Sequence, residues 1–178
     1  NYVHHMPGEG IKSFDSDYLL ISGNKVHDCS RRSSHGVHGL SVYTLSSIDN
    51  NRGYKVIIEN NEVFDNYNEV YSWNQTKTFV NPHYDEGKGI TVQRCYPTTG
   101  WTSGRILIRN NVAYRNGLSG IQVNSGERID IYHNTVYGNH RTTEMYGDGS
   151  QHGLSIQSGD DINVKNNILQ SWNQTTGA

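Results

Sequence analysis

The sequence has few residues that interrupt or cross-link a chain. It holds 3 prolines and 2 cysteines among 178 residues, against 19 glycines. Because proline has no amide donor, its scarcity leaves hydrogen-bonded strand ladders unbroken. Cys29 and Cys95 fall at different positions of the repeat described below. A disulfide needs close approach of its two Cα atoms, so we expect both thiols to be free.

Long apolar runs and a strong charge of one sign are also missing. Only 33% of the residues are hydrophobic, too few for a large compact core but enough for a stack of coils whose core is a thin column. No segment approaches the roughly 18 apolar residues of a membrane helix, so we expect no membrane insertion. The formal net charge is −2, so the chain lacks the excess of basic residues that is typical of a nucleic-acid-binding protein. We therefore expect no nucleic acid partner.

A glycine-led strand recurs five times along the chain. A second apolar segment follows each of these strands, and an asparagine comes three residues after it. The asparagines are Asn24, Asn61, Asn111, Asn134 and Asn167. The steps between them are 37, 50, 23 and 33 residues. The shortest step approximates one bare coil, and the longer ones contain insertions.

This repeat predicts an all-β solenoid, a parallel β-helix of about five coils with long inter-coil loops. Three short strands per coil with period-two alternation place one set of side chains inside, stacked on their equivalents above and below. A side-chain amide both donates and accepts, so asparagines can bond from coil to coil. Asparagine also tolerates a left-handed turn conformation. An antiparallel sandwich, the alternative, has no reason to repeat one asparagine register five times.

The two ends of the sequence carry no cap. Asn1-Tyr2-Val3 matches the Asn-x-Val pattern of the repeat, and the chain closes soon after Leu169. Solenoids need polar caps at their ends. We therefore expect residues 1–178 to form a single β-helix domain that is a fragment of a longer solenoid, with flanking coils or self-stacking at the uncapped ends.

Two segments carry a family resemblance: Ile108-Arg109-Asn110-Asn111 and Gly120-Ile121-Gln122-Val123. The chain resembles the pectate-lyase-like superfamily of right-handed parallel β-helices, and more narrowly the bacterial secreted β-helix repeat proteins related to polysaccharide lyases. The resemblance implies a right-handed helix, a secreted or cell-surface location, and a polysaccharide groove along one sheet bordered by long loops. The superfamily also contains hydrolases, epimerases and adhesins, so the fold alone does not decide the function.

The glycine-led strands resemble the groove-forming sheet of that superfamily. Two side-chain columns are expected to point outward from it: Lys12, Ser41, Thr91, Gln122 and Ser155, then Phe14, Tyr43, Gln93, Asn124 and Gln157. We interpret four of these residues as substrate-binding: Lys12, Gln93, Gln122 and Asn124. The alternative is that any outward sheet face must be polar.

Three insertions, at residues 29–38, 65–87 and 137–152, each precede a glycine-led strand and should emerge on one edge. Long loops on a rigid scaffold are often functional. The aromatics Trp73 and Tyr84 in the longest insertion are predicted to contact substrate.

A lyase of the resembled family removes the proton α to a uronate carboxylate, which calcium or arginine neutralises. We predict Lys88 as the base, since desolvation beside cations lowers a lysine pKa. Arg94 is predicted to pair with the carboxylate, and Asp85 and Glu86 to bind Ca²⁺. The stretch Asp85-Glu86-Gly87-Lys88-Gly89 departs from the family's Asp-Gly-Asn-Gly-Ile, and a surface ion-pair cluster is the alternative interpretation.

His35 and His38 lie just before the strand that contains Tyr43, and a second candidate acid–base pair is His38 with Tyr43. The alternative is that both are solvent-facing loop histidines. No spacing identifies the two carboxylates of a glycoside hydrolase, so a polysaccharide lyase acting on an acidic polymer by β-elimination is favoured. A non-catalytic carbohydrate-binding, adhesive or structural segment of a larger secreted protein is the competing function.

Overall fold

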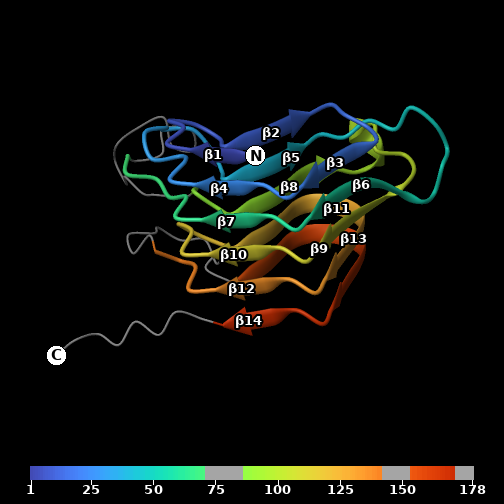
Figure 1. Ribbon diagram of the computed structural model, residues 1–178. Coiled ribbons are helices and arrows are strands. Elements are labelled where there is room, and N and C mark those ends of the chain that lie inside the picture. The colour runs from blue at the N-terminus through green and yellow to red at the C-terminus, as the bar shows by residue number, and fades with distance from the viewer. Residues whose placement is uncertain (71–85, 142–152, 171–178) are drawn as a thin grey trace.

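The computed structural model describes residues 1–70, 86–141 and 153–170, and the chain winds there into stacked coils (Figure 1). The first three coils contain β1 (Tyr2–His4), β2 (Ile11–Phe14), β3 (Leu19–Ser22), β4 (Lys25–His27), β5 (Leu40–Tyr43), β6 (Tyr54–Glu59), β7 (Glu62–Phe64), β8 (Ile90–Cys95) and β9 (Arg105–Arg109). The later coils contain β10 (Val112–Tyr114), β11 (Ile121–Tyr132), β12 (Thr135–Tyr137), β13 (Leu154–Lys165) and β14 (Ile168–Gln170). A short 3-10 turn, η1 (Pro97–Thr99), follows β8.

All the strand pairs are parallel, and they form two sheets in the described part of the chain. One is six-stranded, in the order β1-β4-β7-β10-β12-β14. The other joins β2-β5-β8-β11-β9-β6-β3, with β13 paired to β11. The long strands β11 and β13 each span both the glycine-led and the following apolar segment, and so connect two faces of the coil. The predicted all-β parallel solenoid is confirmed.

The core is a narrow column of apolar side chains, one layer per coil. In the six-stranded sheet, Val26 pairs in register with Val63, and Ala113 pairs with both Val63 and Val136. All four are fully buried. Alternation then directs the neighbouring residues of each strand outward. The low apolar content is therefore sufficient, because each coil contributes only a few inward side chains.

The predicted asparagine ladder runs through the stack. Nδ2 of Asn61 donates to Oδ1 of Asn111 at 3.0 Å, and Nδ2 of Asn111 donates to Oδ1 of Asn134 at 3.0 Å. Each amide also donates to a backbone carbonyl, for example from Asn61 to Ile21 at 3.0 Å. The ladder thus satisfies polar groups of the turn from coil to coil, as expected.

The expectation that these asparagines adopt the left-handed conformation is wrong. The residue before each ladder position has the positive φ, between 53° and 64°: Gly23, Asn60, Asn110, His133 and Asn166. The left-handed residue turns the chain, which leaves the next amide free to point along the stack. One residue therefore adopts the left-handed turn conformation, and the asparagine after it makes the hydrogen bonds of the ladder.

A second ladder lies five residues after the first and was missed in the sequence. Nδ2 of Asn66 donates to Oδ1 of Asn116 at 3.0 Å, and Nδ2 of Asn116 donates to Oδ1 of Asn139 at 2.9 Å. Cys29 occupies the same position one coil earlier, where its backbone amide donates to Asn66. The recurring Asn-x-x-x-x-Asn spacing is the signal that could have identified it.

Both cysteines are free, as expected, and both are buried. Burial raises the pKa of the Cys95 thiol to about 11, so this thiol is protonated at neutral pH. In the last described coil, Ile156, Val164 and Leu169 remain exposed, and stacking of further coils there stays a prediction. Among the described residues, no helix has the length and apolar character needed to cross a membrane.

Candidate functional site

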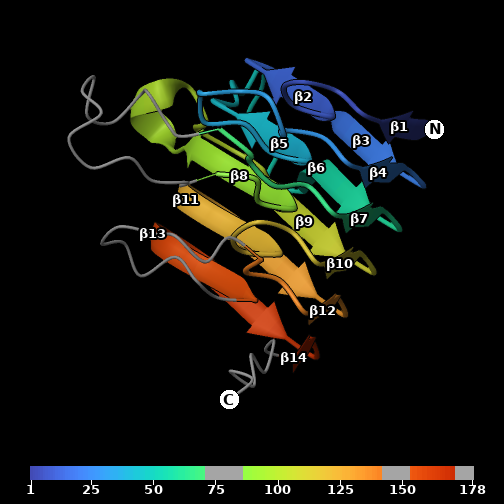
Figure 2. The same cartoon turned by 90° about the vertical axis from the view of Figure 1, so that its left-hand side faces the viewer.

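The candidate site lies on the outer face of the glycine-led strands, which Figure 2 shows stacked in the order β2, β5, β8, β11 and β13. The first outward column was expected to meet solvent. Instead Ser41, Thr91 and Gln122 are at most 2% exposed. The second column is more open: Phe14 is 59% exposed, and Gln93 is half-buried. Of the two columns predicted to point outward, the second is therefore the more accessible one.

Three polar side chains meet beside this buried column. Nζ of Lys88 lies 2.8 Å from Oε2 of Glu86, and Nδ1 of His38 lies 3.4 Å from the same oxygen. Each of His38 and Lys88 directly precedes the glycine of its strand, and the amide of Gly39 donates to the carbonyl of Lys88 at 2.9 Å. Stacking of adjacent coils thus brings together residues about 50 positions apart in the sequence.

His38 is held in its neutral form. Burial lowers its pKa well below the usual 6.5, and the nearby cations Lys88 and Lys12 lower the pKa further. Nε2 of His38 lies 2.7 Å from Nε2 of Gln93. We assign the proton to Nδ1, facing Glu86, so that Nε2 accepts from the Gln93 amide. Nε2 is then the basic atom, and it points toward the half-exposed Gln93.

Tyr43 is at the centre of the open part of the site. Its ring stacks on Phe14 with centroids 5.5 Å apart. Nζ of Lys12 lies 5.6 Å from the ring centroid of Tyr43, and the guanidinium carbon of Arg94 lies 5.8 Å from it. Tyr43 is also the register partner of Gln93. The four residues predicted as catalytic (His38, Tyr43, Lys88 and Arg94) therefore lie along one connected face.

Glu9 belongs to this site and was missed in the sequence. It accepts from the Ser41 hydroxyl at 2.9 Å and pairs with Lys12 at 2.9 Å. Glu9, His38, Lys88 and Ser119 all directly precede a repeat glycine. A polar residue at that repeat position is the signal that could have indicated it.

Buried polar groups with no hydrogen-bond partner among the described residues lie in or beside the cluster. They are Nδ1 of His38, which lies 3.4 Å from Glu86 without a hydrogen bond, the hydroxyl of Thr91 and both amide atoms of Gln122. Thr91 and Gln122 are paired in register on β8 and β11. An unpaired buried polar group costs about 1–3 kcal/mol. Such groups are candidates for contact with a polar ligand.

The unpaired amide of Gln122 predicts that Gln122→Met stabilises the fold or leaves it unchanged, by 0 to about 2 kcal/mol, because methionine keeps the shape without the orphaned atoms. Thermal or urea unfolding measures the effect, with the exposed Gln157→Met as the matched control. A loss above about 1 kcal/mol would mean that the Gln122 amide has hydrogen-bond partners in solution.

The predicted calcium site is only partly within the described chain. Trp73, Tyr84 and Asp85 lie outside the described residues. Glu86 holds the Lys88 ammonium and faces His38, which fits an ion pair better than a calcium ligand. Within residues 1–70, 86–141 and 153–170, no group of three or more metal-binding side chains gathers. Calcium dependence stays a prediction.

The described parts of the loops emerge on one edge, as the sequence predicted. Three backbone hydrogen bonds connect these segments. The amide of Gly87 donates to the carbonyl of Val37 at 3.0 Å, the backbone amide of Gly117 to the backbone carbonyl of Asn66 at 2.7 Å, and that of Arg141 to the backbone carbonyl of Asn116 at 3.1 Å. Side chains from different coils therefore meet on this edge.

Comparison with known proteins agrees with this architecture. The family model described as the right handed beta helix region matches residues 1–169. No curated protein and no solved structure matches the chain. Since the family match covers nearly the whole sequence, and the parallel sheets follow the coil repeat throughout the described residues, the chain belongs to the right-handed β-helix family.

Proposed function

We propose that this protein is an extracellular polysaccharide lyase that cleaves an acidic, uronate-containing polymer by β-elimination. The observation that carries the proposal is the neutral His38, which lies between Glu86 and Gln93 beside the cation Lys88. A neutral imidazole whose second nitrogen faces a carboxylate, here at 3.4 Å, is suited to act as a general base. Strongly perturbed groups of this kind gather at functional sites.

In the proposed reaction, Nε2 of His38 takes the proton from the carbon α to the uronate carboxylate. The released electron pair forms a carbon–carbon double bond, and the bond to the glycosidic oxygen breaks. The phenol of Tyr43 supplies a proton to that leaving oxygen. Substrate must first displace Gln93 from His38, because His38 itself is buried.

His38 replaces Lys88 as the preferred base because the Lys88 ammonium donates to Glu86 at 2.8 Å, and an ammonium has no free electron pair. Lys88 instead helps to keep His38 neutral. The cations Lys12 and Arg94, both over the ring of Tyr43, are suited to neutralise the substrate carboxylate. No step requires calcium.

The test is the near-ultraviolet absorbance of unsaturated uronate products. The protein is incubated with polygalacturonate, alginate and a neutral dextran, with calcium and with a chelator. We expect product from at least one acidic polymer and none from dextran. Absence of product from every acidic polymer, with the fold intact by circular dichroism, would exclude the lyase.

The second candidate function is non-catalytic carbohydrate binding. It is favoured by the burial of the cluster, since the side chains of His38 and Lys88 are only 2% and 8% exposed. Under this alternative the polymers bind without product formation, so the two functions give different results in the same incubation.

A further inference from the structure

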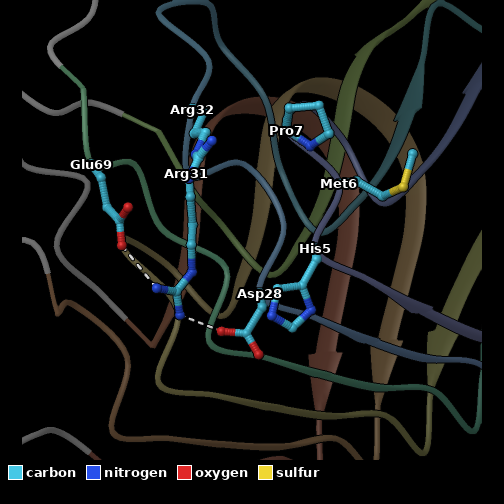
Figure 3. A pocket seen from close by; sticks show the side chains of 7 residues that line it. All are labelled: His5, Met6, Pro7, Asp28, Arg31, Arg32 and Glu69. Carbon is cyan, nitrogen blue, oxygen red and sulfur yellow. Dashed lines mark hydrogen bonds and ion pairs between the residues drawn. The ribbon is translucent and has the colours of Figure 1, made fainter.

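A second cluster lies on the loop edge of the solenoid, outside the catalytic face. A pocket of about 530 Å³ opens there, lined by His5, Met6, Pro7, Asp28, Arg31, Arg32 and Glu69 (Figure 3). A neighbouring pocket of about 340 Å³ shares Asp28 and Arg31 with it and adds Asp65, Tyr67, Arg115 and Arg141. We call the four arginines of these two pockets the arginine edge: Arg31, Arg32, Arg115 and Arg141.

Carboxylates hold three of these arginines in place. Arg31 donates to Glu69 at 2.8 Å and also to Asp28, as the dashed lines of Figure 3 mark. Asp65 accepts from both Arg115 and Arg141, the latter at 2.7 Å. Fixed guanidinium groups lose less side-chain entropy when they bind a further anion, which favours binding.

These guanidinium groups retain donors at the surface. The side chains of Arg31, Arg115 and Arg141 are 30%, 44% and 40% exposed. Arginine carries five N–H donors, and the contacts with the carboxylates engage only some of them. Arg32 is exposed, lines the first pocket and makes no ion pair within the described residues. Donors therefore remain for another anion.

Apolar surface lies beside the donors. The ring centroid of Tyr67 is 4.4 Å from the guanidinium carbon of Arg31 and 4.9 Å from that of Arg141. Met6 and Pro7 line the first pocket. Sugar rings need such surface for their apolar faces, in addition to hydrogen-bond donors.

The balance of charge in the two pockets fits a ligand whose anionic groups are sparse rather than densely spaced. The two pockets contain four arginines against three carboxylates, Asp28, Asp65 and Glu69, in a protein of net charge −2. A densely charged polyanion needs a larger positive excess. The arginines also follow strands of different coils (β4, β10 and β12), so the edge extends along the stack as a polymer does.

We propose that the arginine edge is a secondary binding site for the carboxylate groups of an acidic polysaccharide, which it holds beside the catalytic face. This inference rests on the proposed function for the identity of the polymer. Arg32 and the free donors of Arg141 bind the carboxylates in two-point geometry. Met6 and Pro7 contact a sugar ring. The ring of Tyr67 packs against the guanidinium groups of Arg31 and Arg141, and Asp65 keeps Arg115 and Arg141 in position.

Calorimetric titration of the whole protein with polygalacturonate and alginate oligosaccharides tests the proposal. The variants are Arg32→Ala, Arg141→Ala and their combination. We expect the double variant to bind at least about tenfold more weakly, as the loss of charge-assisted hydrogen bonds implies. Arg109→Ala is the matched control, since Arg109 is 45% exposed and pairs with Glu59 at 2.7 Å away from these pockets. Its affinity should stay within about twofold of the wild type, because exposed ion pairs contribute little.

Arg32→Ala removes no ion pair of the described residues, so its effect is separable from misfolding. Unchanged affinity in the double variant, an equal loss in Arg109→Ala, or no binding of either acidic polymer would overturn the proposal. Weakened binding in the double variant, with no unsaturated product from the wild type, would retain the arginine edge and reject the lyase.

Discussion

Replacing His38 by alanine is expected to lower kcat/KM on the acidic polymer by about 10²–10⁴-fold, the usual contribution of a general base. The imidazole is neutral, faces Glu86 with Nδ1 at 3.4 Å, and is directed through Gln93 toward the open half of the site. No other described side chain on this face combines these features. Initial rates of product absorbance at several substrate concentrations measure the effect.

Two comparisons separate this role from a structural one. Lys88→Ala should lower activity less than His38→Ala does. It should also move the acidic limb of the pH–rate profile to higher pH, because Lys88 helps to lower the pKa of His38. If Lys88→Ala instead abolishes activity while His38→Ala retains it, the base is Lys88.

His38 also makes the stability of the fold depend on pH. The pKa of folded His38 lies well below its ordinary value of 6.5. Between these two values the unfolded chain binds more protons, so the free energy of unfolding falls as the pH decreases below 6.5. In His38→Ala this part of the pH dependence should disappear.

Asn111→Ala is expected to destabilise the fold by about 3–5 kcal/mol, because it leaves buried polar groups without partners. Asn111 is 1% exposed and is in the middle of the ladder. Its Oδ1 accepts from the amide and the side chain of Asn61, and its Nδ2 donates to the carbonyl of Ile58 at 2.9 Å. The substitution leaves the backbone amide of Asn61 and the carbonyl of Ile58 without these hydrogen-bond partners.

Urea unfolding followed by circular dichroism measures this loss. Asn124→Ala is the control, since Asn124 is half-buried outside both ladders and should change stability by no more than about 0.5 kcal/mol. A loss below about 1 kcal/mol for Asn111→Ala would indicate that water replaces the ladder contacts.

The repeat by itself determined the fold and the stacking of the coils. The spacing from Asn24 to Asn167 identified one turn per coil, and the alternation around Val63 and Ile90 identified the inward side chains. These features are local and recur with a constant pattern, so one chain suffices to find them. The free state of Cys29 and Cys95 followed from the same register. The second ladder has an equally local signal at Asn66, hidden only by the insertions.

Only the tertiary structure decided which side chains form the site and which are accessible. The contacts from His38 to Glu86 and Gln93 join residues far apart in sequence. These contacts depend on how the loops pass over the coil below. The burial of Gln122 was likewise not predictable, since alternation gives the direction of a side chain but not what covers it. The physical reason is that strand periodicity is encoded locally, whereas the burial and charge of a site depend on packing between coils.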